Sequence, residues 1–198
     1  MVVKQSQYIM KLKNNIAIFS VIGFFAICMA GYGIYSFSNR SKRTLEKQLV
    51  AMDGMRINLD FENAITVYDG IDSTYFPSNT RKLVLYVDST SCSGCFLSHL
   101  VGYHDINDSL VAHGGELLVL LHPQRGRMEE IKTRMRHERY PFWCIVDVSG
   151  EFIAKNPELP ENKLLHTFSL DEQSNVILVG DPTRNEKINE LFYREVLK

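Results

Sequence analysis

Acidic residues are absent from the first 43 positions of this 198-residue chain. The same stretch contains six basic residues: Lys4, Lys11, Lys13, Arg40, Lys42 and Arg43. The rest of the chain carries 16 basic and 23 acidic side chains, so this larger part is mildly acidic. Because a nucleic-acid-binding protein needs a basic surface, we expect no nucleic-acid partner. The sequence also lacks internal repeats and low-complexity segments.

Charge is also missing from residues 16–37, a run of 22 mostly apolar residues. As a helix this run would be about 33 Å long, enough to cross a hydrocarbon core of about 30 Å. A cleaved signal peptide has a shorter apolar region, of about 7–15 residues. We therefore predict a transmembrane anchor over residues 16–37, preceded by a short basic tail over residues 1–15.

The orientation of this anchor is not decided by its flanking charges. Basic residues stand on both sides of the run in nearly equal number. Long domains cross a membrane largely regardless of such charges. We expect the part that follows the anchor to lie outside the cytoplasm.

Residues 38–80 are interpreted as a juxtamembrane stalk and an extended lead-in. Leu45, Leu49 and Met52 have helical spacing, and Gly54 is expected to end that helix. Residues 61–80 contain turn sequences among scattered apolar residues, which indicates a short hairpin or an extended segment.

Residues 81–198 have the pattern of a folded α/β domain. Apolar runs predict strands at 83–87, 117–121, 142–146, 167–170 and 176–179. Helical spacing of apolar residues predicts helices at 93–113, 128–140 and 185–197. The first three strands alternate with helices and should be parallel, whereas the last two should form a hairpin. The predicted fold is a mixed β-sheet flanked by helices on both faces.

Two cysteines, Cys92 and Cys95, stand where the first of these strands ends and the first helix begins. Unpaired backbone N–H groups and the helix dipole favour a thiolate at such a place. Cys95 lies one turn further along, less exposed and close enough to bond to Cys92. Cys92 is therefore the candidate nucleophile that attacks a substrate disulfide, and Cys95 the residue that resolves the mixed disulfide.

Other interpretations of this pair stay open. A metal site could use Cys92, Cys95, His99 and His104, but structural zinc sites usually draw ligand pairs from separate segments. His99 and His104 would also point about 140° apart on a helix. The cysteines could instead form an ordinary structural pair. Phe96 excludes haem attachment, which needs a histidine there. We predict no metal and no cofactor.

Asp88 lies four residues before Cys92, at the end of the predicted strand. Its carboxylate could accept a proton from Cys95 as a general base. Alternatively it could cap the loop by accepting hydrogen bonds from the N–H groups of residues 89–91, which is the interpretation we favour. Cys144, inside a predicted strand, is expected to be a small buried core residue.

Two motifs carry a resemblance to a known family: LVLYVDSTSCSGC at 83–95 and HTFSLDEQSNVILVG at 166–180. With them, the segment 82–197 resembles a thioredoxin-like domain in the style of membrane-anchored TlpA-like thiol-disulfide oxidoreductases. The first motif also resembles Bacteroidetes-type thioredoxin-like proteins. The resemblance implies a reductase or isomerase on the periplasmic side of a bacterial cytoplasmic membrane. Its substrates would be protein disulfides or thiols.

The sequence departs from the family pattern near the expected site. Ser91 stands where the family usually has an aromatic residue, and Ser93-Gly94 separates the cysteines. The family has a cis-proline before Thr-Phe, where this chain has Leu165, and Pro160 is five residues too early. That proline shapes the groove for the substrate peptide in the family. A non-catalytic thioredoxin-like module that binds a partner near the membrane is therefore the alternative function.

Overall fold

The structure is a computed structural model that describes residues 27–29, 31–124 and 126–198. The chain forms two compact units, Met1–Lys47 and Gln48–Lys198. Residues 27–29 and 31–52 are helical, and Gly54 follows with φ +71°, which confirms the predicted helix end. Among the described residues, no helix is both long and apolar enough to cross a membrane. The tail 1–15 and residues 16–26 and 30 of the anchor lie outside the described residues, so both segments stay predictions.

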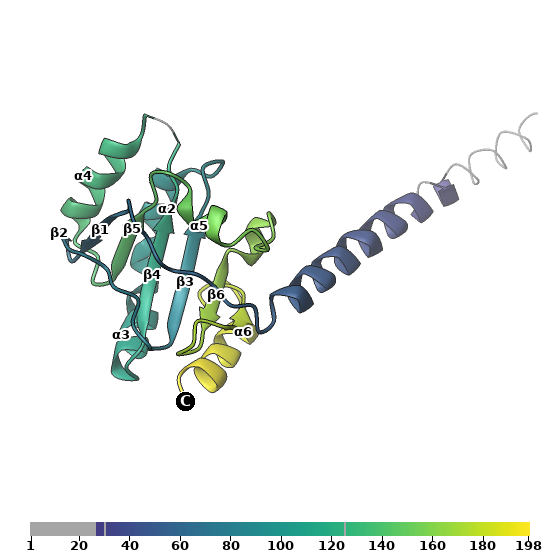
Figure 1. Cartoon of the computed structure of the whole chain (residues 1–198). Helices are drawn as coiled ribbons and strands as arrows, with labels where there is room; N and C mark the ends of the chain where they lie inside the picture. The colour runs from purple at the N-terminus through teal and green to yellow at the C-terminus, as the bar shows by residue number, and fades with distance from the viewer. Residues whose placement is uncertain (1–26, 30, 125) are drawn as a thin grey trace, which may run out of the picture. The chain divides into compact units, whose positions relative to one another are not determined.

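The second unit is built on a seven-stranded sheet with the order β2-β1-β5-β4-β3-β6-β7 (Figure 1). The strands are β1 (Ile65–Tyr68), β2 (Ile71–Asp72), β3 (Lys82–Val87), β4 (Glu116–Leu121), β5 (Trp143–Val146), β6 (Thr167–Leu170) and β7 (Val176–Val179). The helices are α2 (Ser93–His99), α3 (His104–Ala112), α4 (Met128–Glu138), α5 (Glu151–Lys155) and α6 (Glu186–Leu191). Shorter helical turns are η1 (Leu100–Tyr103), η2 (Lys163–Leu165) and η3 (Phe192–Val196). As predicted, β3, β4 and β5 are parallel and β6 and β7 form an antiparallel hairpin.

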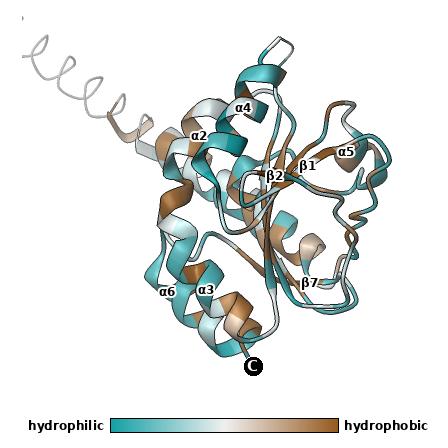
Figure 2. Cartoon of the chain, turned by 90° about the vertical axis from the view of Figure 1, so that its left-hand side faces the viewer, coloured by the Kyte–Doolittle hydropathy of each residue, from teal (hydrophilic) through white to brown (hydrophobic). Residues whose placement is uncertain are grey.

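Alternation along β3 supplies apolar side chains to both faces of the sheet. Leu83, Leu85 and Val87 belong to one buried cluster with residues of α2, α3 and α4. Tyr86 packs its ring 4.8 Å from that of Phe152 in α5. Figure 2 shows α2, α3, α4 and α6 on one side of the sheet and α5 on the other. The predicted mixed sheet with helices on both faces is therefore confirmed.

The predicted helical stretch over 93–113 is helical as far as Ala112, but the structure divides it into α2, η1 and α3. Gly102 lies in the 3₁₀ turn between the two helices, and glycine disfavours an α-helix by about 1 kcal/mol relative to alanine. The hydroxyl of Tyr103 donates a hydrogen bond of 2.6 Å to Asp181, which holds this bend against the segment after β7. The predicted last helix is divided in a similar way, since its second half is the π-helix η3.

Two strands of the sheet, β1 and β2, precede residue 81, the predicted start of the folded domain. β1 and β2 form the short hairpin that the sequence indicated, but β1 also pairs antiparallel with β5. Ile65 stands opposite Val146 in that pairing. Helix α5 was not predicted either. Its first N–H groups, those of Glu151 and Phe152, donate to the buried carboxylate of Asp147 at 2.9 Å.

A buried polar cluster closes the end of the sheet where β3 and β4 begin. The side chain of Lys82 is fully buried, and its ammonium group lies 3.4 Å from the Glu116 carboxylate. The same ammonium donates to the backbone carbonyls of Ser78 and Thr80 at 2.5 and 2.7 Å. Glu116 also accepts from the hydroxyls of Tyr75 and Ser78. These bonds fix the loop between β2 and β3 to the sheet.

Candidate active site

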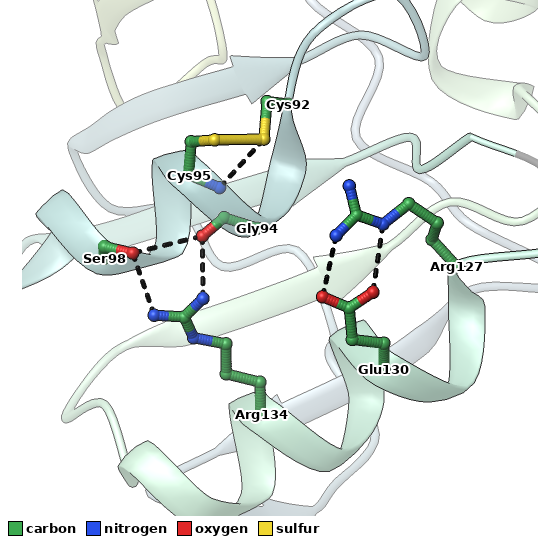
Figure 3. Close-up of a disulfide and its surroundings, with 7 residues drawn as sticks. All are labelled: Cys92, Gly94, Cys95, Ser98, Arg127, Glu130 and Arg134. Atoms are coloured by element: carbon green, nitrogen blue, oxygen red, sulfur yellow. Dashed lines mark hydrogen bonds and ion pairs between the residues drawn. A yellow bond between two sulfur atoms is a disulfide. The ribbon is translucent and has the colours of Figure 1, made fainter.

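Cys92 and Cys95 form a disulfide at the start of α2, with their Cα atoms 5.3 Å apart (Figure 3). β3 ends at Val87, and Cys92 is the N-cap residue of the helix that follows. The Cys92 Sγ atom accepts a hydrogen bond of 3.2 Å from the backbone N–H of Cys95. This is the strand–helix junction that the sequence predicted for the pair. Both cysteines are exposed, so Cys95 is not shielded from solvent as a buried resolving residue would be.

The Asp88 carboxylate organises the loop that leads to Cys92. It accepts hydrogen bonds from the backbone N–H of Thr90 and from the hydroxyls of Thr90 and Ser91, at 3.1, 2.9 and 2.6 Å. Lys163 lies 3.3 Å away. Partial burial alone would raise the pKa of Asp88, but these hydrogen bonds and Lys163 outweigh it and hold the pKa below its ordinary value. A carboxylate so occupied is a weak proton acceptor, which favours the loop-capping role.

A cavity of about 410 Å³ lies beside the disulfide. Its lining includes Phe96 and His99 of α2. Distant parts of the chain also line it, with Lys163, Leu164, His166, Asp181 and Arg184. The disulfide is therefore both exposed and next to a space that another molecule could enter.

Several solved structures are similar to this chain. A thiol:disulfide interchange protein from Bacteroides is matched with a TM-score of 0.50, at 14% identity, over 74% of this chain and 91% of that one. The chain has a thioredoxin-like fold. The thioredoxin domain of a thiol-disulfide oxidoreductase from Bacteroides vulgatus is matched with a TM-score of 0.47, at 14% identity, over 73% and 97% of the two chains.

A third match is the C-terminal domain of an uncharacterized protein from Bacteroides fragilis, with a TM-score of 0.43 and 19% identity over 70% and 94% of the two chains. No family model matches the sequence, and no curated protein matches it. The predicted thioredoxin-like fold is thus confirmed by structure rather than by sequence similarity.

Leu165 is where this thioredoxin-like domain departs most from the expected pattern. Its side chain is only 2% exposed, and its N–H donates to the Asn162 carbonyl at 2.9 Å within the turn η2. The neighbouring Leu164 is 74% exposed and lines the cavity, as does His166. The described residues contain no cis peptide bond. Leu165 therefore belongs to the core, and its two neighbours line the cavity together with the disulfide.

His166 contributes a buried imidazole to the lining of the cavity. It is 5% exposed, its ring lies 5.0 Å from that of Tyr86, and its Nε2 atom lies 2.9 Å from the Pro160 carbonyl oxygen. Burial lowers the pKa of His166, although the contact with Pro160 and the charge of Asp88 oppose that effect. The neutral ring, with its proton on Nε2, is the form that this environment favours. Nothing in the local sequence singled this residue out.

The four residues of the alternative metal site do not converge. His99 lines the cavity with the cysteines, whereas the His104 ring packs edge-on against Phe142 at 6.1 Å. In the described part of the chain, no group of three or more histidine, cysteine or acidic residues could hold a metal ion.

Cys144 is 1% exposed, and burial strongly raises the pKa of its thiol, as expected for a core cysteine.

Proposed function

We propose that the chain is a thiol-disulfide oxidoreductase that reduces protein disulfides. The observation that carries the proposal is the exposed Cys92–Cys95 disulfide at the start of α2, beside a cavity and within a thioredoxin-like fold. The names of two structural neighbours, a thiol:disulfide interchange protein and a thiol-disulfide oxidoreductase, support it. The substrate would be a protein with an accessible disulfide.

The proposed reaction uses both cysteines in turn. In the reduced protein, the Cys92 thiolate attacks one sulfur of the substrate disulfide, which forms a mixed disulfide and releases one substrate thiolate. The Cys95 thiolate then attacks Cys92 Sγ, releases the second substrate thiolate, and closes the Cys92–Cys95 disulfide. Two electrons pass to the substrate. A thiol donor must then reduce the pair again before the next turnover.

The geometry around Cys92 supports its proposed role as the attacking residue. As the N-cap residue it stands at the free end of α2, and its sulfur already accepts the Cys95 N–H in the disulfide form. The same N–H can hydrogen-bond to a Cys92 thiolate and stabilise it. Leu164, a highly exposed residue of the cavity lining, offers an apolar contact to the substrate next to the disulfide.

The reductase assignment predicts a simple assay result. The full chain, purified in detergent, should accelerate the reduction of insulin by dithiothreitol, and Cys92→Ser should lower the rate to that of dithiothreitol alone. Cys28→Ser is the matched control, because among the described residues it removes the exposed cysteine that lies outside the Cys92–Cys95 pair. Full activity in Cys92→Ser would refute the assignment.

We also propose that residues 16–37 anchor the protein in a bacterial cytoplasmic membrane, with residues 81–198 in the periplasm. The uncharged run and the following long domain support this location. A reporter that is active only outside the cytoplasm, fused after Lys198, should therefore be active. If only a reporter of cytoplasmic location gives signal at the same site, the proposed orientation is wrong.

A non-catalytic thioredoxin-like module is the second candidate. It is favoured by Leu165, which replaces the expected proline and lies in the core rather than on the cavity wall. Such a module would bind a partner at the cavity beside the disulfide without exchanging thiols. It would show no insulin reduction in either redox state, with or without Cys92.

A further inference from the structure

Helix α4 contacts Gly94, one of the two residues that separate the cysteines. The Arg134 side chain of α4 donates one hydrogen bond of 2.8 Å to the Gly94 carbonyl and another of 2.9 Å to the Ser98 hydroxyl (Figure 3). That hydroxyl in turn lies 3.3 Å from the same carbonyl. A single guanidinium group therefore bridges two successive turns of α2, directly behind the disulfide.

A second arginine, Arg127, also lies close to Gly94. Arg127 forms two hydrogen bonds with Glu130, of 3.0 and 2.8 Å, just before and within the first turn of α4. A Cβ atom at position 94 would lie 3.3 Å from the Arg127 guanidinium and 3.5 Å from the Glu130 carboxylate. Glycine therefore lets this ion pair pack closely against the first turn of α2.

A third contact holds the other end of α2. The buried hydroxyl of Tyr140, just after α4, donates a hydrogen bond of 2.7 Å to the Leu97 carbonyl. The cysteine-bearing helix is thus fixed to one neighbouring segment at Gly94, Ser98 and Leu97. Because α2 has only seven residues, its own hydrogen bonds hold it weakly, and these outside contacts define its position.

The two arginines differ in the charge that they leave near the cysteines. The charge of Arg127 is matched by Glu130 at 2.8 Å. The nearest acid to Arg134 is Glu138, at 4.0 Å, and the Arg134 side chain is 33% exposed. Arg134 therefore brings a positive charge that is only partly compensated to the peptide group of Gly94.

We propose that Arg134 is a positioning residue that sets the balance between the reduced and the disulfide form of the Cys92–Cys95 pair. This inference rests on the proposed function. Reduction breaks the S–S bond with two electrons from a dithiol donor, which becomes a disulfide. One donor proton goes to Cys95, which becomes a thiol, the other goes to solvent, and Cys92 is left as a thiolate. The hydrogen bonds of Arg134 hold the first turn of α2 in the shape that presents the Cys95 N–H to Cys92. Its charge further favours the thiolate, and hence the reduced pair.

The test measures this balance directly. The full chain carrying Cys28→Ser is equilibrated with mixtures of reduced and oxidised dithiothreitol at one fixed pH, and the reduced fraction is read from the mass added by alkylation. Arg134→Met should shift the equilibrium toward the disulfide by about threefold, as expected for one partly exposed charge. Arg134→Lys, which keeps the charge but cannot form the same two hydrogen bonds, should shift it less but in the same direction.

Lys132→Met is the matched control, because Lys132 lies on the same helix and pairs with Glu129 instead. It should leave the equilibrium unchanged. An unshifted equilibrium in Arg134→Met, or an equal shift in the control, would overturn the proposal. If Arg134→Met does not fold, the result for Arg134→Lys decides. An equilibrium in Arg134→Lys equal to that of the Cys28→Ser chain with Arg134 intact would overturn the positioning role. The assay needs no protein substrate, so a failed insulin assay and a failed Arg134 prediction are separate results.

Discussion

A Cys95→Ser variant is expected to accumulate a covalent adduct between Cys92 and a substrate protein, where the unmodified chain shows none. Cys92 lies at the free end of α2 and can attack without Cys95. Release of the adduct depends on Cys95, whose Cα atom is 5.3 Å from that of Cys92. With serine at position 95 the second step stops, because a hydroxyl is a far weaker nucleophile than a thiolate at neutral pH.

The adduct can be detected as a high-mass band on a non-reducing gel of membranes from cells that express the full chain. It should disappear when dithiothreitol is added. The matched control is the double variant Cys92→Ser with Cys95→Ser, which should show no such band. Adducts in the double variant would assign them to Cys28 or Cys144, and the proposed order of attack would be wrong.

A second large effect is expected from Glu116→Ala, which should lower the free energy of unfolding by about 3–5 kcal/mol. The change leaves the Lys82 ammonium fully buried with only the Ser78 and Thr80 carbonyls as partners. It also removes the acceptor for the Tyr75 hydroxyl. A buried charge without its counter-ion costs far more than the loss of an exposed ion pair.

The pH dependence of this effect has a defined sign. Burial already lowers the pKa of Lys82, against the opposing influence of Glu116, and loss of Glu116 lowers that pKa further. The folded variant then binds the lysine proton more weakly than the unfolded chain does. The destabilisation should be complete below the lowered pKa of the folded state and shrink as the pH rises through that pKa.

Urea denaturation followed by circular dichroism measures the loss. Glu195→Ala is the matched control, because Glu195 pairs with Lys198 on the surface and its removal should cost far less than the loss of Glu116. Equal losses in the two variants would contradict the view that the Lys82–Glu116 contact stabilises the loop before β3.

Local patterns in the sequence were enough to find most of the sheet and the redox pair. The apolar runs at 83–87 and 117–121 became β3 and β4, since a strand buried on both faces needs apolar side chains at every position. The hairpin of β6 and β7 could be predicted from its turn sequence. In that turn the Asp171 carboxylate accepts hydrogen bonds from the backbone N–H groups of Gln173 and Asn175. The position of Cys92 and Cys95 between a strand and a helix could be predicted because the apolar run at 83–87 ends shortly before them.

The features that were missed depend on contacts between distant parts of the chain. β1 has only four residues, and its pairing with β5 leaves no mark on its own sequence. Arg134 lies in a helix rich in charged residues, where nothing distinguishes the arginine that reaches Gly94 from those that face solvent. His166 reaches the cavity only because β6 lies next to β3.

The pairing of β1 with β5 also bears on the order in which the chain can fold. Ile65 finds its partner Val146 only after the segment with the two cysteines has been made, because that segment lies between them in the sequence. Contacts over such separations are slow to form, since a long loop must close first. During synthesis, β3 and β4 can pair before β5 has been made. Cys92 and Cys95 are therefore available to oxidants and to other thiols before the sheet is complete.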